Sequence, residues 1–385
     1  MSLGTIIYVG GFELPDKDAA AHRVVGNANA LKEIGYDVVF IDVDRSYVNN
    51  AGFAIKEIEG FTIYSVAFPN SHFQWFKYLT DINEIKKIIS NRDDVKAIIC
   101  YNYPSILLLK LIKYCRKNKV KIISDVTEWY EDTRFIKKID TLIRMKNLNK
   151  KVDGLICISS YLDNYYKHFT NTVIVPPLID LYDEKWNRLP SVPFREKINL
   201  IYSGRPGKHK DKLNIIIESL NSISSKKKIS FFIVGITKKQ YLEYYPEHAN
   251  MVENLKDIVC FTGKISHSKS IELVKKSDFQ IFIRESKRVN NAGFPTKFVE
   301  SMACGTPVIT TKTSDLGKYL INNKNGFFID YIDNESLSIA LNNIIRMERK
   351  KIIRMKEHCF NIDAFDYRCH TEKMNKFLTN IFETR

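Results

Sequence analysis

The chain of 385 residues has few glycines, no closely paired cysteines and no long apolar run. Its 16 glycines are about 4% of the residues, against a typical ~7%, so each one marks a position that needs explaining. No segment approaches the ~18 uninterrupted apolar residues of a membrane-spanning helix, and no basic stretch precedes an apolar one at the N-terminus. The seven cysteines form no Cys-x-x-Cys pair, which argues against a zinc site or a disulfide framework. We therefore expect a soluble, cytoplasmic protein with reduced thiols.

Positive charge is in excess, and the excess is local. Lys and Arg number 59 against 44 Asp and Glu, a net charge of +15. Residues 1–100 hold 10 basic and 13 acidic side chains, residues 101–150 hold 12 and 5, and residues 201–300 hold 18 and 10. This distribution indicates specific anionic partners. Nucleic acid is not favoured, because aromatic residues do not interleave with the basic clusters as a stacking platform would require.

Short apolar runs alternate with segments of helical spacing. Runs such as IICY, FFIV and IFI are typical of parallel strands buried on both faces, and 20–34 and 213–220 show helical periodicity. The alternation predicts two doubly wound α/β domains. We expect strands at residues 5–9, 37–41, 62–66, 97–101, 121–124 and 154–158, and then at 198–203, 230–234, 258–262, 279–283, 307–311 and 327–330.

Proline and glycine divide the chain and mark its strand ends. Four of the eleven prolines lie between Pro176 and Pro193, which predicts an interdomain linker and domains of residues 1–180 and 181–365. Ligands of open parallel sheets bind beyond the carboxyl ends of the strands. The glycines that follow predicted strands favour a cleft between two Rossmann-like halves; they are Gly10, Gly11, Gly204, Gly207, Gly235 and Gly263.

The most informative segment is residues 290–309, NNAGFPTKFVESMACGTPVI. It reads as a glycine loop, a helix opened by Pro295 and an apolar strand after Gly305. The free N–H groups and the dipole of such a helix favour an anion at its start. Glu300, about one and a half turns along, is within reach of nucleotide sugar hydroxyls. On spacing alone, an ordinary βαβ unit with a solvated Glu300 remains an alternative.

This segment resembles the donor-site signature of retaining glycosyltransferases of family four, the group 1 type common in bacterial polysaccharide biosynthesis, which have the GT-B fold. Their pattern is a Glu, then Gly-Phe, then a second Glu eight positions after the first, followed by Ala-Met-Ala-Cys-Gly-x-Pro-Val-Ile. Collinear resemblances precede and follow it, strongest over 198–330: Tyr202-Ser203-Gly204-Arg205 with Lys210, the strand ending in Gly235, the loop at Gly263, and Gly326-Phe327-Phe328. Weaker ones lie at Gly10-Gly11 with 23–27 and at 153–159.

The resemblance implies a GT-B fold, with two Rossmann-like domains facing a central cleft, and a C-terminal helix, 366–385, that crosses back onto the first domain. It also implies a nucleotide-sugar donor, UDP- or GDP-linked, with no cofactor and no metal. The donor-binding residues would be Gly11, Gly204, Arg205, Lys210, Gly235, Asn290, Asn291, Gly293, Phe294, Thr296, Lys297 and Glu300. Arg205 and Lys210 would stabilise the departing diphosphate. Retention would follow from front-side attack, with the departing phosphate taking the proton of the acceptor.

Two departures from the pattern bear on catalysis. Ala292 stands where the family has its first Glu, which contacts the transferred sugar. Either Asn290 or Asn291 contacts the sugar instead, or the chain binds a sugar nucleotide or a partner enzyme without catalysing transfer. Pro295 has no N–H, so Thr296 and Lys297 are the expected phosphate contacts.

Evidence for the acceptor side is thinner. Asp125 and Glu128 follow a predicted strand, and Asp125 is the candidate catalytic contact on this side, with Glu128 second. A charged loop that caps the next helix is an equal alternative. Asp42-Val43-Asp44 has the form of a metal-binding Asp-x-Asp, but it only ends a strand, and we expect no metal there.

The first domain also carries two basic clusters, Lys110–Lys121 and Arg134–Lys151, beside apolar positions that begin at Leu107. Such a segment, 107–151, could contact an anionic membrane at its inner face, although solvated helix faces are the plainer interpretation. The favoured function is therefore a glycosyltransferase that moves a sugar, of the hexosyl type, to a glycan or lipid-linked glycan. The alternative is a catalytically silent GT-B protein. A GT-B epimerase is less favoured, because the additional acidic and His residues are missing.

Overall fold

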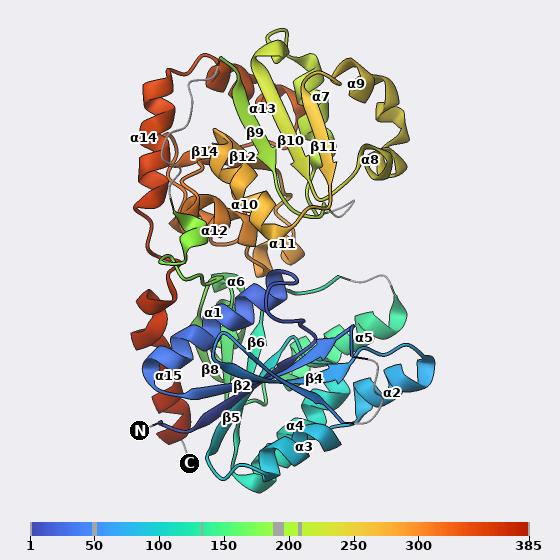
Figure 1. Ribbon diagram of the computed structural model, residues 1–385, viewed down its shortest axis with the longest axis vertical. Helices are drawn as coiled ribbons and strands as arrows, with labels where there is room; N and C mark the ends of the chain where they lie inside the picture. Colours follow the sequence, from blue (N-terminus) through green and yellow to red (C-terminus); the bar gives the residue numbers. More distant parts are fainter. Residues whose placement is uncertain (1, 48–51, 132–133, 188–195, 207–209, 384–385) are drawn as a thin grey trace. The chain divides into compact units, whose positions relative to one another are not determined.

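The structure is a computed structural model that describes residues 2–47, 52–131, 134–187, 196–206 and 210–383. The chain forms two compact units (Figure 1). Unit 1 comprises Met1–Asp180, Ala292–Phe294 and Phe365–Arg385, and unit 2 comprises Leu181–Asn291 and Pro295–Ala364. The boundary at Asp180 falls directly after Pro176 and Pro177, and Gly207 lies outside the described residues.

Unit 1 is built on an eight-stranded sheet in the order β3-β4-β2-β1-β5-β6-β7-β8. All neighbours are parallel except β3 and β4, which pair antiparallel at one edge. Every residue of β1 is buried, as expected for a central parallel strand. The strands are β1 Thr5–Gly10, β2 Asp37–Asp44, β3 Ala54–Ile58, β4 Phe61–Ala67, β5 Val95–Tyr101, β6 Lys121–Val126, β7 Gly154–Cys157 and β8 Asn171–Ile174.

The helices of unit 1 connect these strands and cover the sheet (Figure 1). They are α1 Ala19–Ile34, α2 His72–Thr80, α3 Asn83–Ser90, α4 Ser105–Asn118, α5 Phe135–Ile143 and α6 Ser160–Tyr166, with one turn of π-helix at Arg144–Leu148. The long helix α1 begins at Asp18, whose side chain accepts N–H bonds from Ala20 and Ala21, and ends at Gly35 in the left-handed region.

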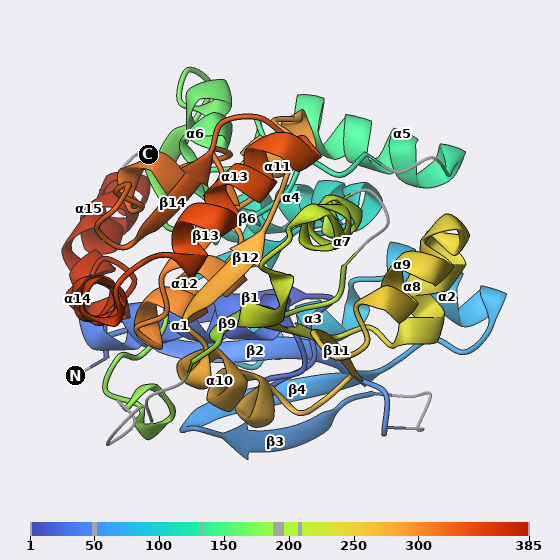
Figure 2. The same cartoon turned by 90° about the horizontal axis from the view of Figure 1, so that it is seen from above.

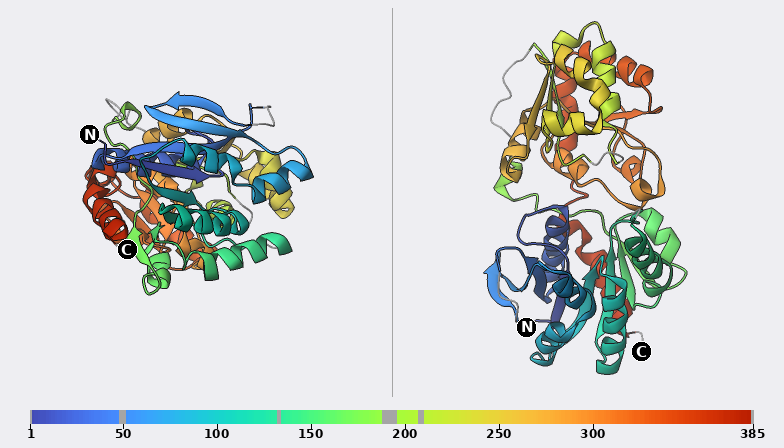
Figure 3. Two further views of the ribbon diagram at one scale, coloured as in Figure 1. Left: turned by 90° about the horizontal axis from the view of Figure 1, so that it is seen from below. Right: turned by 90° about the vertical axis from the view of Figure 1, so that its right-hand side faces the viewer.

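The C-terminal helix α15, Thr371–Glu383, packs in unit 1 beside α1 and β8 (Figure 1, and Figure 3, right). Its Phe377 and Ile381 lie directly on β7 at Gly154. A methyl group at position 154 would come within 2.3 Å of the Ile381 Cδ1 atom, so the close docking of α15 requires glycine there. The last segment of the chain therefore belongs to the core of the first unit.

Unit 2 contains a fully parallel six-stranded sheet in the order β11-β10-β9-β12-β13-β14 (Figure 2). The strands are β9 Ile198–Tyr202, β10 Ile229–Val234, β11 Val259–Gly263, β12 Phe279–Phe282, β13 Val308–Thr311 and β14 Gly326–Ile329. The helices are α7 Leu213–Ser222, α8 Lys238–Tyr244, α9 Ala249–Asn254, α10 His267–Lys276, α11 Arg288–Ala292, α12 Thr296–Ala303, α13 Asn334–Ile345 and α14 Arg349–Phe360.

The structure confirms the predicted class of two parallel-sheet, Rossmann-like α/β units, and each of the twelve predicted strands is present. Two further strands, β3 and β8, were not predicted. The edge strand β3 has no continuous apolar run, and β8 (NTVI) buries only Val173, so neither carries the signal of a strand buried on both faces.

Candidate functional site

The strand order of unit 2 reverses between β9 and β12, since β10 and β11 extend the sheet on one side and β13 and β14 on the other. In open parallel sheets the crevice at such a reversal is where ligands bind. Gly204 and Arg205 follow β9 here, and Arg284 follows β12 shortly after its last residue. The candidate donor site is therefore built around the carboxyl ends of these two strands (Figure 2).

Two glycines allow the loops at this edge to approach closely. Gly235, after β10, has a φ of +102°, and a methyl group there would lie 2.3 Å from the carbonyl oxygen of Gly204. Its N–H donates to the carbonyl of Gly263 across to β11 (2.8 Å). Only glycine fits both the backbone conformation and the contact, so Gly235 fixes the position of the Gly204–Arg205 loop.

A buried ionic cluster supports that loop from below. Asp211 accepts hydrogen bonds from the Arg284 Nε atom (2.5 Å), the Lys297 Nζ atom (2.8 Å) and the Tyr202 hydroxyl (2.6 Å). All three charged side chains are at least nine-tenths buried. The Lys297 ammonium also lies over the Tyr202 ring at 3.9 Å. With two cations and one carboxylate, the cluster carries a net charge of +1 at the crevice.

The cluster perturbs the pKa values of its members. Burial would raise the pKa of Asp211, but Arg284 and Lys297 outweigh it and hold that pKa well below its usual range. Burial, helped by the neighbouring Arg284, lowers the pKa of Lys297 to about 8, although Asp211 opposes the shift. Lys297 therefore begins to lose its proton just above neutral pH. A bound anion would favour the protonated form.

Arg205 and Lys210 occupy the solvent side of the same edge. Arg205 and Gly204 are exposed, and Lys210 is half-buried next to Asp211. A methyl group at Gly204 would lie 3.5 Å from the Lys297 Nζ atom, so the buried ammonium sits directly behind the loop. Of the predicted phosphate contacts, Arg205, Lys210 and Lys297 thus share one edge of unit 2 with the start of α12.

Helix α12 begins at Thr296 after Pro295, and no side chain caps its first turn. Thr296 is half-buried in that turn. Further along, the Oε1 atom of Glu300 lies 3.0 Å from the Nε2 atom of His267, at the start of α10. Glu300, the predicted partner of nucleotide hydroxyls, is therefore held by a histidine that the sequence interpretation had not singled out.

The segment before α12 is buried. Ala292 is fully buried, its carbonyl accepts a hydrogen bond from the Ser159 hydroxyl (2.7 Å), and Gly293 and Phe294 group with unit 1, where Phe294 packs against Phe365. Gly293 and Phe294, predicted donor contacts, are thus buried in packing.

Asn290 and Asn291 differ in whether their side-chain oxygen atom has a hydrogen-bond partner. Asn291 donates to the Ser286 Oγ atom (3.1 Å), and its Oδ1 atom accepts the N–H of Ser314. Asn290 is buried and donates to the Glu285 carbonyl (2.9 Å), but its Oδ1 atom has no partner among the described residues. An unpaired buried acceptor is costly unless a ligand or water completes it. Of the two, Asn290 retains an unused polar atom.

The side chain of Asp125 is fully enclosed by protein groups. It is fully buried in unit 1, where it pairs with the guanidinium of Arg23 (2.8 Å) and accepts hydrogen bonds from the Tyr8 hydroxyl (2.5 Å) and the Asn27 amide. The Asp125 carboxylate links α1 to β6 and is enclosed by these donors, which is the arrangement of a buried structural pair; its contact with an acceptor stays a prediction. Glu128, the second candidate, is half-buried. Gly11 lies exposed after β1, near the Tyr78 hydroxyl.

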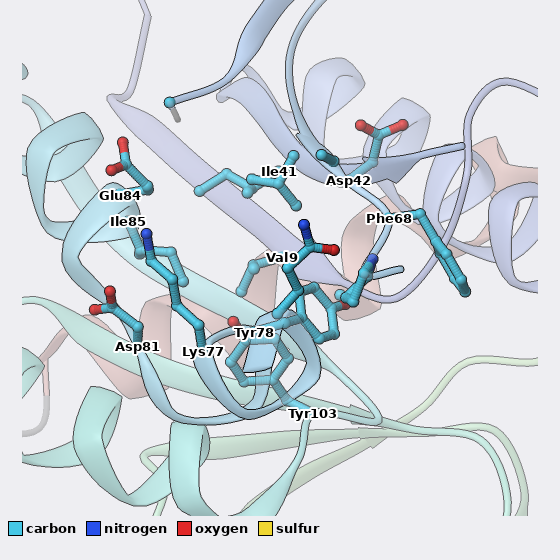
Figure 4. A pocket seen from close by; sticks show the side chains of 16 residues that line it. Val9, Ile41, Asp42, Phe68, Lys77, Tyr78, Asp81, Glu84, Ile85 and Tyr103 are labelled. Atoms are coloured by element: carbon cyan, nitrogen blue, oxygen red, sulfur yellow. The ribbon is translucent and has the colours of Figure 1, made fainter. Parts of the chain in front are cut away.

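Unit 1 also contains a pocket of about 140 Å³ at the carboxyl ends of β1, β2 and β4 (Figure 4). Lys77 of α2, Asp81 between α2 and α3, and Glu84 of α3 line one side, while the rings of Tyr78 and Tyr103 line another. Burial raises the pKa of Tyr78 to about 12 and that of Tyr103 well above its usual value. Both phenols are therefore protonated at neutral pH and can donate hydrogen bonds to a ligand.

The two carboxylates at the end of β2, Asp42 and Asp44, contact other residues of unit 1. Asp42 lines the pocket, is buried, and accepts the N–H of Leu14 (3.1 Å). Asp44 pairs with Lys56 and accepts hydrogen bonds from Ser46, contacts that lower its pKa to about 2 against the effect of burial. The two carboxylates therefore have separate partners.

The sequence and the fold are similar to those of known proteins. Residues 185–358 match the family described as glycosyl transferases group 1, a match that covers most of unit 2.

A curated relative, described as an uncharacterized glycosyltransferase of Methanocaldococcus jannaschii, is 28% identical over 193 residues, which are 48% of this chain and 47% of the relative. The chain thus aligns with about half the length of that relative.

Solved structures extend the likeness to the whole chain. Sucrose-phosphate synthase from Thermosynechococcus elongatus is 14% identical, covers 99% of this chain and 100% of its own, and has a TM-score of 0.76. HepE from Anabaena, solved with UDP and glucose, is 14% identical over 98% of this chain and 100% of its own, with a TM-score of 0.70. The trehalose-6-phosphate protein from E. coli, solved with UDP-2-fluoro glucose, is 11% identical over 99% of each chain, with a TM-score of 0.71. These likenesses establish the fold, and none of the comparisons supports a catalytically silent protein.

Proposed function

We propose that the protein is a retaining, metal-independent glycosyltransferase of the family-four type that uses a nucleotide-sugar donor, UDP- or GDP-linked, and a glycan or lipid-linked glycan acceptor. The observation that carries the proposal is the cationic edge of unit 2. Arg205, Lys210 and Lys297 gather there at a strand-order reversal, beside the start of α12. The same region matches the group 1 glycosyl transferases.

The chemistry follows from where charge develops. As the bond between sugar and diphosphate breaks, negative charge accumulates on the departing phosphate oxygens. The forked guanidinium of Arg205 and the ammonium of Lys210 stabilise that charge, and the N–H groups of the first turn of α12 add to it. Lys297, fixed by Asp211, supplies a third positive charge that does not have to reorganise during the reaction.

The missing carboxylate at position 292 is compensated by Asn290 in this proposal. Its Oδ1 atom, buried and unpaired among the described residues, would be reached by a hydroxyl of the transferred sugar when the donor binds. Asn290→Ala should then raise the donor KM or lower kcat for a sugar nucleotide while leaving the affinity for the free nucleoside diphosphate unchanged. Asn291→Ala is the matched control, because both polar atoms of Asn291 are already engaged.

For the acceptor we propose the pocket of unit 1. Carboxylates beside aromatic rings suit a saccharide, whose hydroxyls donate hydrogen bonds and whose C–H faces pack on rings. Asp81→Asn and Lys77→Ala should raise the acceptor KM and leave the donor KM unchanged. A lipid-linked acceptor would be met at a membrane surface, so peripheral contact with an anionic membrane belongs to the same proposal.

The deciding experiment is turnover across a panel of UDP- and GDP-sugars, with and without oligosaccharide acceptors. Transfer with retained anomeric configuration, unaffected by EDTA, is the expected result. Absence of both hydrolysis and transfer for every donor would refute the enzymatic proposal, and tight nucleotide binding in the same samples would then favour the silent alternative.

A further inference from the structure

Helix α5 in unit 1 is amphipathic, and its apolar face is exposed to solvent. Its apolar residues recur at helical spacing and are exposed, with Phe135 and Ile136 75% and 80% accessible; the others are Ile139, Leu142 and Ile143. The face that packs inwards is polar: Thr141 is buried, and Asp140 accepts the N–H of Ser105 at the start of α4 (2.8 Å). A surface helix normally buries its apolar stripe against the core, so this arrangement indicates an external partner.

The partner has to accept positive charge as well as apolar groups. Lys137 and Lys138 lie within the same helix, are exposed, and have no ion-pair partner among the described residues. Residues 101–150 as a whole hold 12 basic against 5 acidic side chains. A second copy of the chain would bring the same positive surface against itself. An anionic lipid surface, by contrast, offers negative headgroups above an apolar layer.

Helix α2 presents a second surface of the same kind. Phe73 and Phe76 are 75% and 66% exposed, Trp75 and Leu79 are also exposed, and α2 buries none of its residues. Both α2 and α5 pack against α4, and both project from unit 1 at the same end (Figure 1; Figure 3, left). Tryptophan and phenylalanine are frequent where proteins meet the lipid headgroup layer.

The basic helix predicted to contact lipid has its own apolar stripe occupied. Leu107, Leu108, Leu111 and Ile112 of α4 are buried in unit 1, so that stripe is not available to a membrane. Among the described residues, no helix has the length and apolarity needed to span a bilayer. Contact would therefore be with one leaflet, through the side chains that α5 and α2 expose.

We infer that α5, assisted by α2, docks unit 1 on an anionic membrane surface. Phe135, Ile136 and their exposed apolar neighbours enter the headgroup layer, and Lys137 and Lys138 contact its negatively charged headgroups. This inference rests on the proposed function in one respect: a lipid-linked acceptor would give the enzyme a reason to contact a membrane. The contact itself depends on α5 and α2 alone.

The test is co-sedimentation of the full chain with vesicles of phosphatidylcholine alone and of phosphatidylcholine mixed with phosphatidylglycerol. Binding is expected to the mixed vesicles only, and Phe135→Ser with Ile136→Ser should weaken it about 100-fold, since each apolar side chain removed from lipid accounts for roughly a tenfold loss. Ile136→Trp should show a blue-shifted emission on adding the mixed vesicles.

A charge-matched pair separates a docking surface from general attraction to a basic protein. Lys137→Glu with Lys138→Glu should abolish binding, whereas Lys350→Glu with Lys351→Glu, exposed on α14 of unit 2, changes the net charge equally and should leave binding intact. Equal loss in both pairs, or no binding by the wild type, would overturn the inference. So would a wild-type dimer that the α5 variants convert to monomer.

The two proposals can fail separately. Vesicle binding without turnover of any nucleotide sugar would remove the proposed function and leave the docking surface. Transfer to a soluble oligosaccharide without vesicle binding would support the proposed function and remove the docking surface. Since no α5 residue lies in the candidate donor site or the pocket, the α5 variants should retain wild-type activity on soluble substrates.

Discussion

Replacing Asp211 by Asn tests the ionic cluster behind the donor loop. The substitution keeps the shape of the side chain and an acceptor for the Tyr202 hydroxyl, but leaves Arg284 and Lys297 as buried cations without a counter-charge. Removal of one partner from a buried ion pair typically costs about 3–5 kcal/mol. Because all three side chains are at least nine-tenths buried, solvent screening should reduce this little, and we expect a loss of about 3–5 kcal/mol in the unfolding free energy of unit 2.

The loss of unfolding free energy in Asp211→Asn should become smaller as the pH rises. In wild type, Asp211 raises the pKa of Lys297, and the balance with burial leaves it at about 8. Without the carboxylate that pKa falls further, so folded Lys297 releases its proton at a lower pH than in wild type. A lysine whose pKa is lower folded than unfolded makes stability rise with pH. The Asp211→Asn deficit should therefore be largest below neutrality and smaller at alkaline pH.

Trp186 is the one tryptophan of unit 2 and is buried, so its fluorescence reports this unit once Trp75 and Trp129 are replaced by Phe. Urea unfolding in that background gives the free energies. The control is Glu253→Gln, which breaks the exposed Lys238–Glu253 pair (3.0 Å) elsewhere in unit 2 and should leave the free energy of unfolding nearly unchanged at every pH. A loss below about 1 kcal/mol for Asp211→Asn, the scale of an ordinary hydrogen bond, would show that Asp211 does not stabilise the two buried cations.

Three further outcomes are expected. Donor affinity measured by calorimetry should fall as pH rises through about 8, where Lys297 loses its charge, and Lys297→Arg should move that fall to higher pH; a flat profile would contradict the role of Lys297. Gly235→Ala should cost about 1–3 kcal/mol in thermal unfolding and weaken donor binding, because its methyl group meets the Gly204 carbonyl, whereas Gly52→Ala, which has a φ of +83° but no neighbour within 4 Å, should be milder. Asp125→Asn should destabilise unit 1 by about 3–5 kcal/mol with donor affinity unchanged; altered acceptor KM at unchanged stability would restore Asp125 to the acceptor site.

The sheets were predictable because their central strands are apolar on both faces. Runs such as 5–9 and 229–234 leave little other choice of structure, and the glycines after them mark the ligand-facing edge. The edge strand β3 alternates half-buried and exposed residues, so its pairing with β4 depends on tertiary context that local patterning does not carry.

The site was predictable in part. Arg205, Lys210 and Lys297 come from motifs, and the structure brings them to one edge of unit 2. Asp211 and Arg284 were missed, although each carried a signal: Arg284 directly follows an apolar strand, and Asp211 adjoins Lys210. The partner of Asp125 was not predictable, because a carboxylate at a strand end can face a ligand or a buried arginine, and only the packing of Arg23 on α1 distinguishes the two.

The outward apolar face of α5 shows a further limit of sequence patterning. Its spacing predicts an amphipathic helix equally well whichever side faces the core. The decisive facts, a buried Thr141 and an Asp140 bonded to the start of α4, are tertiary.

The central claim is that unit 2 binds a nucleoside diphosphate at Arg205 and Lys210. Titration calorimetry of UDP and GDP against wild type and Arg205→Ala with Lys210→Ala tests it directly, with Lys227→Ala and Lys228→Ala, exposed at the amino end of β10, as a control of equal charge. We expect one of the nucleotides to bind wild type and the control alike and to bind the Arg205/Lys210 variant about 100-fold more weakly, because two charge-assisted contacts are lost. Binding unchanged in that variant, or no binding of either nucleotide to wild type, would contradict it.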